Sequence, residues 1–235
     1  MEEYAIVLDN ISKTFYIRDR SDNSIRAKLR NIIANERNQR PIKALSEINL
    51  KIKKGEIIGI IGHNGSGKST LLKLIMGSIL PDKGGSIYRT GKIIRLALGM
   101  GFDEELTARD NIYLNASILG VTFKQIGLIF DEIIEFAGLE DFIDTPIKFY
   151  SNGMKSRLAF SVGMQAKADI LLFDEFFGGV GDEEFMKKSS TAFDQMIESG
   201  RTIIIVSHNR TRIEEKCQRF IELRSGKMIK SSIQW

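Results

Sequence analysis

One stretch of the chain has the residue types and spacing to hold a phosphate group. It follows the apolar run at 56–61 and leads into a run with helical periodicity that begins at Thr70. Its residues are Gly62, His63, Asn64, Gly65, Ser66, Gly67, Lys68, Ser69 and Thr70. The glycines let backbone N–H groups wrap a phosphate, Lys68 reaches the β- and γ-phosphates, and the Ser69 hydroxyl can ligate Mg²⁺. A glycine-rich turn with a solvated lysine is the alternative, and the flanking strand and helix signals disfavour it.

Two acidic residues, Asp174 and Glu175, directly follow a second apolar run, 170–173. Alone, two acids after a strand are more often a solvated turn. The phosphate-binding loop upstream reverses that weighting, because an aspartate at the carboxyl end of the sheet then lies opposite the loop and holds Mg²⁺, usually through water. Glu175 is then placed to orient and polarise the attacking water.

A second anion-binding signal lies shortly before this acidic pair. Ser151, Asn152, Gly153 and Met154 open a segment with helical spacing of its apolar residues. A Ser-x-Gly turn entering a helix presents free N–H groups and the positive end of the helix dipole. Because one loop already holds one nucleotide, we expect this helix to serve the nucleotide of another subunit. A simple N-cap at Ser151 is the alternative.

A histidine, His208, follows the apolar run at 202–206 and precedes a new helix. At the carboxyl end of a strand, its imidazole can hydrogen-bond a γ-phosphate and so respond to the phosphate's presence. A solvated histidine is the alternative.

The elements that must position these groups read as short strands alternating with helices, which predicts an α/β domain with a largely parallel sheet. Thr107 with Asp110, and Thr122 with Gln125, have the spacing of helix N-caps, and Gly138 closes the second helix. Residues 104–165 are therefore expected to be helical. The expected strands are 5–9, 46–53, 56–61, 86–89, 92–96, 170–174, 202–206 and 219–224.

The 235 residues suit one well-buried domain, and the single cysteine, Cys217, excludes an internal disulfide framework and favours a reducing compartment. The apolar runs are far shorter than the ~20 residues of a spanning helix. The N-terminus lacks the basic and apolar regions of a signal peptide. We therefore expect a cytoplasmic protein without a membrane segment of its own.

The positive charge is concentrated in one segment. Residues 18–43 carry eight basic and three acidic residues, whereas the rest of the chain carries 26 basic and 27 acidic residues. Such local concentration is untypical of nucleic-acid-binding proteins. Within the segment, residues 25–33 have amphipathic helical spacing, with Ser24 as a candidate N-cap. This helix is expected either to meet anionic lipid or a lipid-pyrophosphate head group, or to pack on the domain as a surface helix.

The order of these motifs resembles the ATP-binding cassette (ABC) family over essentially the whole chain. The segment Tyr150–Ser161 is not the common Leu-Ser-Gly-Gly-Gln signature and is instead similar to that of exporters of O-antigen, capsule and teichoic acid. Three other stretches resemble the same exporters: Gly101-Phe102 with Glu105-Leu106-Thr107 and Asp110–Leu114, Gly181-Asp182, and the basic segment at 18–43.

The resemblance implies a P-loop NTPase fold with a RecA-like core, an antiparallel β subdomain and an inserted helical subdomain. The chain would be a single cassette over 1–235, with 1–103 and 166–235 forming the core and β subdomain, 104–165 the helical subdomain carrying the signature, and 18–43 a basic insertion.

The resemblance also implies ATP and Mg²⁺ as cofactors and a role for each site residue. Phe15, or else Tyr16, would stack on adenine, and Lys68 would bind phosphates. Ser69 and Asp174 would hold Mg²⁺, Glu175 would be the general base, and His208 would contact the γ-phosphate. Ser151 and Gly153, with Asn152 and Met154 beside them, would contact the ATP of the opposite protomer.

Two positions depart from the family pattern. The glutamine that usually touches the metal falls at Asp103, which could approach Mg²⁺ as a carboxylate. The aspartate of the loop after Glu175 falls at Asp182, one residue later than usual, and the glycines at 178–179 can absorb the extra residue.

By resemblance, the chain would be a homodimeric ATPase that drives a separate transmembrane permease, expected in two copies, to move a lipid-linked glycan. It would lie on the cytoplasmic face of the cell membrane and bind no nucleic acid. The alternatives are a soluble ABC ATPase acting on nucleic acid or ribosomes, an ABC ATPase of a lipid or drug exporter, a nucleotide-binding module without turnover, and a P-loop kinase.

Overall fold

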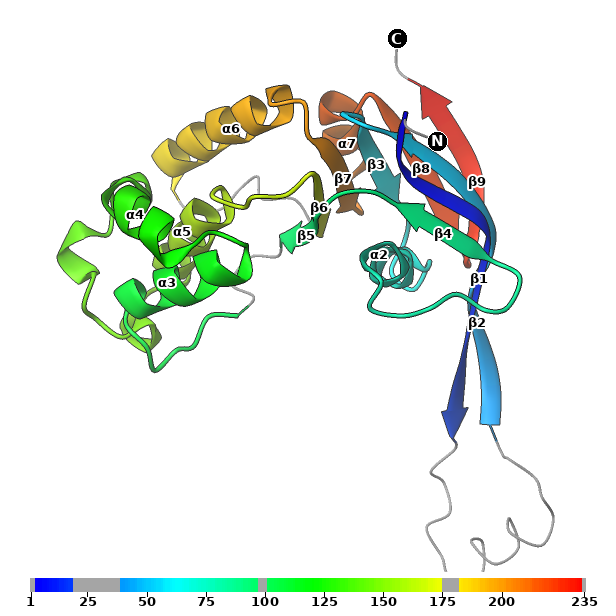
Figure 1. Ribbon diagram of the computed structural model, residues 1–235, viewed down its shortest axis with the longest axis horizontal. Coiled ribbons are helices and arrows are strands. Elements are labelled where there is room, and N and C mark those ends of the chain that lie inside the picture. Colours follow the sequence, from blue (N-terminus) through cyan, green and yellow to red (C-terminus); the bar gives the residue numbers. More distant parts are fainter. Residues whose placement is uncertain (1–2, 19–38, 97–100, 175–181, 234–235) are drawn as a thin grey trace, which may run out of the picture.

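The computed structural model describes residues 3–18, 39–96, 101–174 and 182–233. Two β-sheets lie side by side around a shared core, and a group of helices forms the other end of the molecule (Figure 1). Glu175 and the predicted amphipathic helix at 25–33 lie outside the described residues, so those two predictions remain untested.

The larger sheet contains the strands that the predicted site motifs follow, namely β3, β6 and β7. Five of its six strands are parallel, as predicted, and only the last strand is antiparallel to its neighbour. β-branched residues dominate its centre, and strands β3 and β7 are buried along their whole length, which is typical of strands covered on both faces. In spatial order the strands are β5 (Ile93–Leu96), β6 (Ile170–Asp174), β7 (Thr202–Ser207), β3 (Ile57–Ile61), β8 (Arg219–Arg224) and β9 (Lys227–Ile233).

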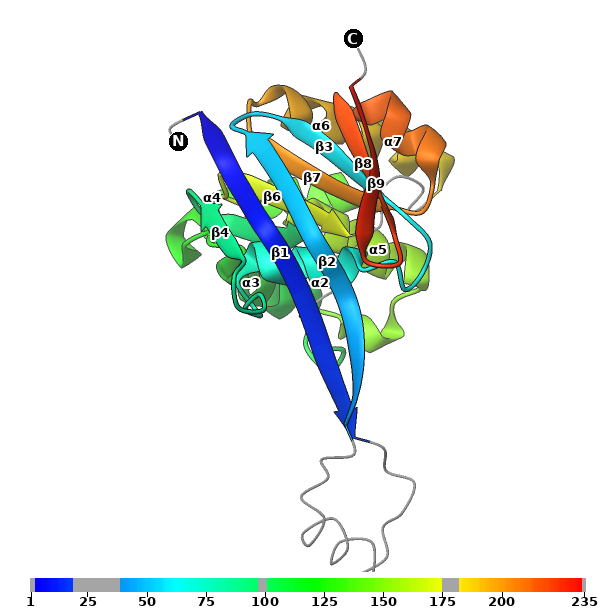
Figure 2. The same cartoon turned by 90° about the vertical axis from the view of Figure 1, so that its right-hand side faces the viewer.

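The smaller sheet is antiparallel and has the order β2-β1-β4. Its first two strands are much longer than the predicted segments 5–9 and 46–53, and their far ends form a two-stranded ribbon that extends beyond the body (Figure 2). The pairing continues from Tyr4 opposite Lys53 to Arg18 opposite Gln39. The strands are β1 (Tyr4–Arg18), β2 (Gln39–Lys53) and β4 (Ser86–Arg89).

Helices cover both faces of the larger sheet (Figure 1). Helix α2 (Lys68–Met76) lies between the two sheets, where its leucines join the core shared by β1, β2, β3 and β7. Helices α6 (Glu183–Glu198) and α7 (Arg210–Lys216) pack on the opposite face through residues such as Phe193 and Ile213. The alternation along β3 explains this division, since Ile58 and Ile60 join the first core while Ile57 and Ile61 join the second.

Helices α3 (Ala108–Ile118), α4 (Phe123–Ala137) and α5 (Asn152–Gly163) share a hydrophobic core of their own. The predicted helix starts are confirmed: Thr107 accepts a hydrogen bond from the Asp110 N–H, and Thr122 forms a reciprocal capping box with Gln125. Gly138 ends α4 in the left-handed conformation, also as predicted. Two short 3₁₀ turns, Glu140–Phe142 and Ile147–Phe149, connect α4 to α5.

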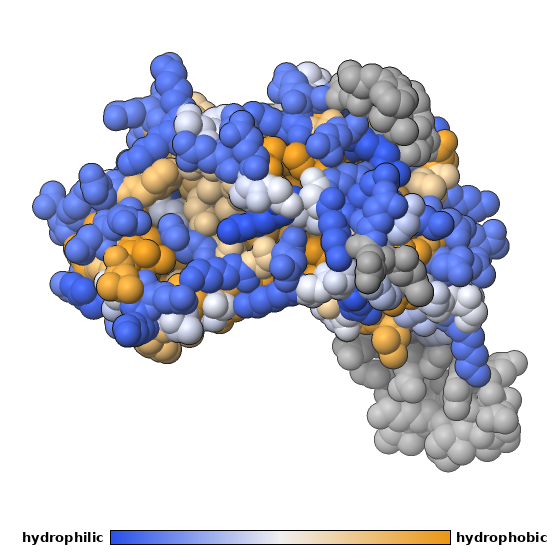
Figure 3. Space-filling model, turned by 45° about the horizontal axis from the view of Figure 1, so that its top comes forward, coloured by the Kyte–Doolittle hydropathy of each residue, from blue (hydrophilic) through white to orange (hydrophobic). Residues whose placement is uncertain are grey.

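Within the described ranges, no helix has both the length and the apolar character that crossing a membrane requires. The face shown in Figure 3 is mostly hydrophilic, and its hydrophobic residues gather in a few groups, one of them at the end of the molecule that the helices form.

Candidate nucleotide site

The carboxyl ends of three neighbouring strands meet at one edge of the larger sheet. Ile61, at the end of β3, lies opposite Ser207 of β7, and Asp174, at the end of β6, lies opposite Val206 of the same strand. The glycine-rich loop, Asp174 and the exposed His208 therefore leave the sheet at the same edge. Ligands of open α/β sheets bind at this edge, so the sequence motifs converge where phosphate chemistry is expected.

The loop between β3 and α2 is shaped for phosphate. Gly67 caps α2 with a φ of 107°, in the left-handed region. A Cβ at this position would lie 2.7 Å from the Ala44 carbonyl oxygen, so only glycine fits without displacing the backbone. The first turn of α2 contains no acidic residue, which leaves the positive end of its dipole available to an anion.

Lys68 and Ser66 complete the phosphate cradle. The Lys68 Nζ donates hydrogen bonds to the carbonyl oxygens of Gly62 at 2.6 Å and His63 at 2.9 Å, which keeps the ammonium within the loop. The Ser66 Oγ is buried and, among the described residues, has no hydrogen-bond partner. A buried cation and an unpaired hydroxyl beside a helix N-terminus fit a polyphosphate group.

A pocket of about 600 Å³ opens at this loop. Its size is within the range of small-molecule sites. Five of its lining residues, Ile42, Lys43, Ala44, Ser225 and Gly226, were not predicted from the sequence, because they come from β2 and from the β8–β9 turn, which have no motif of their own. The described lining residues are Ile42, Lys43, Ala44, Asn64, Gly65, Gly67, Lys68, Ser69, Thr70, Asp174, Ser225 and Gly226.

The aromatic residues predicted to stack on a base lie on the neighbouring ribbon. Phe15 is 39% exposed and pairs across the hairpin with Ile42, which lines the pocket, although Phe15 itself does not. The Lys13 Nζ lies 5.8 Å from the Phe15 ring centroid. Tyr16 lies one position farther out, opposite Pro41. The stacking role of Phe15 stays a prediction.

The candidate metal ligand Asp174 already has a cationic partner. Its Oδ2 accepts a hydrogen bond from Nη2 of Arg95, a residue of β5 that the sequence analysis did not single out. The two side chains are 17% and 26% exposed, respectively, so this ion pair is partly shielded from water.

Asp103 uses its carboxylate within its own loop. Its Oδ1 accepts the Glu105 N–H at 3.0 Å. The fully buried Asn111 of α3 fixes the backbone beside it, accepting the Asp103 N–H and donating to the Asp103 carbonyl, each at 2.9 Å. To bind a metal ion as well, the Asp103 carboxylate would have to keep its hydrogen bond to the Glu105 N–H and contact the ion at the same time. The metal role of Asp103 stays a prediction.

The N-terminus of α5 lies away from this pocket, among the helices at the other end of the molecule (Figure 1). The Ser151 Oγ accepts the Met154 N–H at 3.2 Å, so Ser151 is the N-cap that the alternative interpretation described. Ser151 and Asn152 are nevertheless exposed. The described residues that line the pocket of the same chain do not include Ser151, Asn152, Gly153 or Met154. Contact with the nucleotide of a second copy stays a prediction.

Asp182 links two helices. It caps α6 by accepting the Phe185 N–H at 2.9 Å, and its carboxylate lies 3.3 Å from the Arg157 guanidinium of α5. The hydrogen bond from the Phe185 backbone, reinforced by the charge of Arg157, holds the pKa of Asp182 below its usual range. The described contacts of Asp182 are thus structural, and its role toward a nucleotide stays a prediction.

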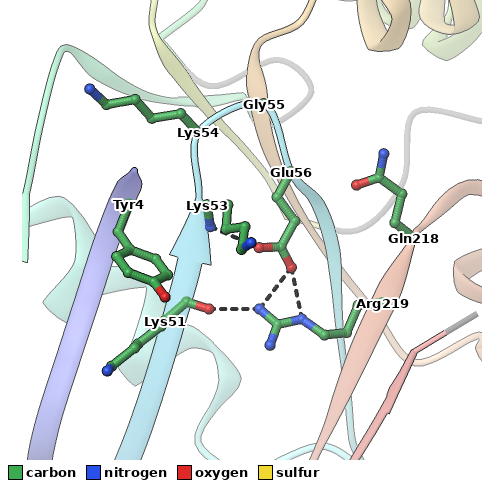
Figure 4. A pocket seen from close by; sticks show the side chains of 8 residues that line it. All are labelled: Tyr4, Lys51, Lys53, Lys54, Gly55, Glu56, Gln218 and Arg219. Atoms are coloured by element: carbon green, nitrogen blue, oxygen red, sulfur yellow. Dashed lines mark hydrogen bonds and ion pairs between the residues drawn. The ribbon is translucent and has the colours of Figure 1, made fainter. Parts of the chain in front are cut away.

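A second pocket of about 460 Å³ lies at the opposite end of β3 (Figure 4). It is lined by Tyr4, Lys51, Lys53, Lys54, Gly55, Glu56, Gln218 and Arg219. Its one carboxylate, Glu56, accepts hydrogen bonds from Arg219 Nε at 2.7 Å and from the Lys53 N–H at 2.8 Å (Figure 4). Glu56 therefore ties the start of β3 to β2 and β8.

The turn between β8 and β9 braces the phosphate loop, which gives a testable prediction. The Gly226 N–H donates to the Ser66 carbonyl at 3.0 Å, and a Cβ on Gly226 would lie 2.6 Å from the Ala44 carbonyl oxygen. We expect Gly226→Ala to weaken nucleotide binding and lower the melting temperature, since the turn must move off the loop.

Gly200→Ala is the matched control for this change. Gly200 has a φ of 75°, against 76° for Gly226, but a Cβ there has no neighbour within 4 Å. Both variants carry the ~1 kcal/mol cost of a left-handed alanine, and only Gly226→Ala adds the collision. Calorimetric nucleotide titrations compare the two variants. Equal affinities for the nucleotide would contradict the prediction that the β8–β9 turn supports the phosphate loop.

Comparison with known proteins assigns the chain to a family. The model of the family described as "ABC transporter" matches residues 45–178. The O-antigen export system ATP-binding protein RfbB of Klebsiella pneumoniae is 42% identical over 79% of this chain and 75% of its own length. The teichoic acids export ATP-binding protein TagH of Staphylococcus saprophyticus is 37% identical over 86% and 75%.

Some relatives are considerably longer than the matched region. The ABC transporter protein AbcA of Aeromonas salmonicida is 44% identical over 80% of this chain, yet the match spans only 60% of AbcA. For the TagH protein of Bacillus anthracis the matched share of its length falls to 40%.

The fold agrees with solved ABC structures. A dimeric structure of a post-hydrolysis state of the ATP-binding cassette MJ0796, bound to ADP and Pi, superposes with a TM-score of 0.71 at 23% identity, covering 97% of this chain and 98% of that one. The predicted P-loop NTPase fold of ABC cassettes is thereby confirmed. With a family match over more than half of its residues and relatives that it covers for three quarters of their length, this chain belongs to the ABC transporter family of ATP-binding cassettes.

Proposed function

We propose that this chain is the ATP-hydrolysing subunit of an exporter that moves a lipid-linked polysaccharide across the cytoplasmic membrane. The observation that carries the ATPase assignment is the pocket that joins the glycine-rich loop, Lys68, Ser69 and Asp174 at the carboxyl edge of the parallel sheet. The polysaccharide assignment draws on the names of the relatives, which describe export of O-antigen and teichoic acids. Those names favour export over action on nucleic acid or ribosomes.

The proposed chemistry divides the work among this chain's residues. The loop amides and Lys68 hold the β- and γ-phosphates, and Phe15 would stack on the adenine base. Ser69 and Asp174 would hold Mg²⁺, with Asp103 as a further candidate, and the bound ion would neutralise charge that develops on the phosphates. Glu175 orients the attacking water and accepts its proton, while His208 donates a hydrogen bond to the γ-phosphate.

The exposed N-terminus of α5 suggests how a second copy takes part. The N–H groups at a helix N-terminus bind anions, and the residues here, Ser151 to Gly153, are not among those that line the nucleotide pocket of their own chain. In a head-to-tail dimer they would meet the γ-phosphate held by the other protomer, and Asp182 would lie near the interface. Opening and closing of this dimer would drive a permease that is a separate polypeptide. Among the described residues of this chain, no helix could cross a membrane.

Export can be tested directly in cells. In the organism that encodes the chain, its loss should leave a lipid-linked glycan accumulating on the cytoplasmic side, because assembly continues while export stops. The wild-type chain should restore surface glycan and copurify with a multispanning membrane protein, whereas Glu175→Gln should copurify but not restore export.

Mass spectrometry of the extracted lipid would identify the glycan. Normal surface glycan without the chain, or copurification with ribosomes in place of a membrane protein, would contradict the export proposal.

A further inference from the structure

The loop that leads from β5 into α3 is hydrogen-bonded to the segment that enters α5. The Lys148 N–H donates to the Glu104 carbonyl at 2.9 Å, and the Ile147 N–H donates to the Leu106 carbonyl at 3.0 Å. These bonds join two stretches of backbone that are distant in the sequence. The entry to α5 is therefore placed by the loop before α3.

Glu104 also contacts α5 itself. Its Oε1 accepts a hydrogen bond at 2.5 Å from Nζ of Lys155, a residue of the first turn of α5. The Lys155 side chain is only 26% exposed, and a cation near the positive end of a helix dipole is disfavoured, so the carboxylate stabilises it there. Glu104 thus holds the chain on both sides of Ser151, at Lys148 through its main chain and at Lys155 through its side chain.

The backbone that carries Glu104 is anchored from α3. The fully buried Asn111 donates hydrogen bonds to the carbonyl oxygens of Asp103 at 2.9 Å and Leu106 at 3.2 Å, one on each side of Glu104. A buried polar group with its hydrogen bonds formed is costly to rearrange, because the low local dielectric strengthens those bonds. The Glu104 side chain therefore projects from a backbone whose position is fixed.

We propose that Glu104 is a positioning residue, which orients the turn at residues 151–154 toward the nucleotide of a partner protomer. This inference rests on the proposed function and adds a residue on which the composite site depends. In the head-to-tail dimer, the N–H groups of this turn must reach a phosphate of the other chain, and hydrogen bonds weaken steeply when the donors are misaligned. Without the Glu104 carboxylate, the turn is held from its entry side alone, so the dimer assembles less tightly.

Dimer assembly is the property to measure. In the Glu175→Gln parent, sedimentation over a range of protein concentrations with Mg²⁺ and ATP gives the dissociation constant of the dimer. From the usual strength of an exposed ion pair, Glu104→Gln should weaken each of the two composite sites about threefold, and the whole dimer about tenfold. Calorimetric ATP binding to the single chain should not change, because Glu104 is not among the residues that line its pocket.

Glu105→Gln is the matched control. Glu105 is the next residue of the same loop, and its carboxylate pairs at 2.6 Å with Lys148, which precedes α5. The control loses one negative charge and one exposed ion pair, as Glu104→Gln does, so the two variants should melt alike. Only Glu104→Gln should weaken the dimer, and equal weakening in Glu105→Gln would attribute the effect to net charge and overturn the inference.

Changes to Lys155 test the other half of the pair. Lys155→Arg retains the charge and should assemble as the parent does. Lys155→Met should weaken the dimer as much as Glu104→Gln, and the double variant should be no weaker than either change alone, because the pair is already broken. Strict additivity would overturn the pair. Tighter assembly in Glu104→Gln would mean that the released lysine binds the partner's phosphate, and would also overturn the inference.

The outcomes also distinguish this inference from the proposed function. Absence of an ATP-dependent dimer in the Glu175→Gln parent would overturn both. A normal dimer in the parent, with the same dissociation constant in Glu104→Gln, would overturn the role of Glu104 alone.

Discussion

Replacing Glu175 with glutamine is expected to stop ATP hydrolysis while leaving ATP binding intact. Glutamine has nearly the same shape as glutamate but cannot accept the proton of the attacking water, and loss of a general base costs ~10²–10⁴-fold in rate. Lys68, Ser69 and Asp174, which line the pocket, are untouched by the change. ATP should therefore bind, remain uncleaved and hold the dimer closed.

Phosphate release measures the turnover of this variant, and size-exclusion chromatography with Mg²⁺ and ATP measures the dimer. Glu183→Gln is the matched control, since it removes the same charge from the exposed first turn of α6, where Glu183 pairs with Lys187 at 3.2 Å. The control should retain wild-type turnover. Turnover by Glu175→Gln at the rate of the control would remove Glu175 from the mechanism.

Ser151→Arg is expected to abolish hydrolysis by a different route, blocking dimer closure without affecting the nucleotide pocket of its own chain. Ser151 is exposed at the N-terminus of α5 and lies outside that pocket. A long cationic side chain there would occupy the space in which the partner's phosphates must dock. Because half of the composite site is never assembled, turnover should fall by ~10²-fold or more.

The N-cap provides the control for this variant. Replacing Ser151 with alanine or arginine removes the hydrogen bond from the Met154 N–H, which costs ~1 kcal/mol of stability. Ser151→Ala has this loss without added bulk, so the two variants should melt alike while only Ser151→Arg fails to dimerise. Calorimetric ATP binding should be normal in both, and a loss of binding in Ser151→Arg would mean that the signature helix acts within its own chain.

Local sequence signals predicted the local structure well. The caps at Thr107 and Thr122 and the end of α4 at Gly138 are confirmed, since each depends on residues within three positions of one another. The buried strands of the larger sheet were also found, because continuous β-branched runs have few other interpretations.

Strands stabilised by distant partners were underestimated. The ribbon beyond Asp9 contains Lys, Asn, Thr and Arg in positions without clear alternation. Its length comes from pairing with β2, a strand that is distant in the sequence even at the nearest pair, Arg18 with Gln39. The edge strand β9, rich in Lys and Ser, was missed for the same reason. Its partner β8 supplies the ladder that its own composition does not predict.

The residues of the candidate site likewise fall into those that a local motif predicts and those that distant strands bring into place. The phosphate loop, Asp174 and His208 were identified because a motif occupies consecutive residues, and the sheet then brings the ends of β3, β6 and β7 together. Lys43 and Arg95 could not be identified, because their placement depends on strand register between distant segments. Asp103 has a structural hydrogen bond that a motif comparison does not reveal.

The most direct test of the account mixes two inactive proteins. Lys68→Ala damages the phosphate loop and Ser151→Arg damages the signature, and both carry Glu175→Gln so that captured ATP is retained. Neither alone should retain labelled ATP in a dimer. In a mixed dimer, one site combines the intact loop of the second protein with the intact signature of the first, so mixing should restore up to about a quarter of the wild-type sites by random pairing. Absence of retained ATP in the mixture, with both proteins folded and Ser151→Arg binding ATP normally, would contradict a site built from two copies of this chain.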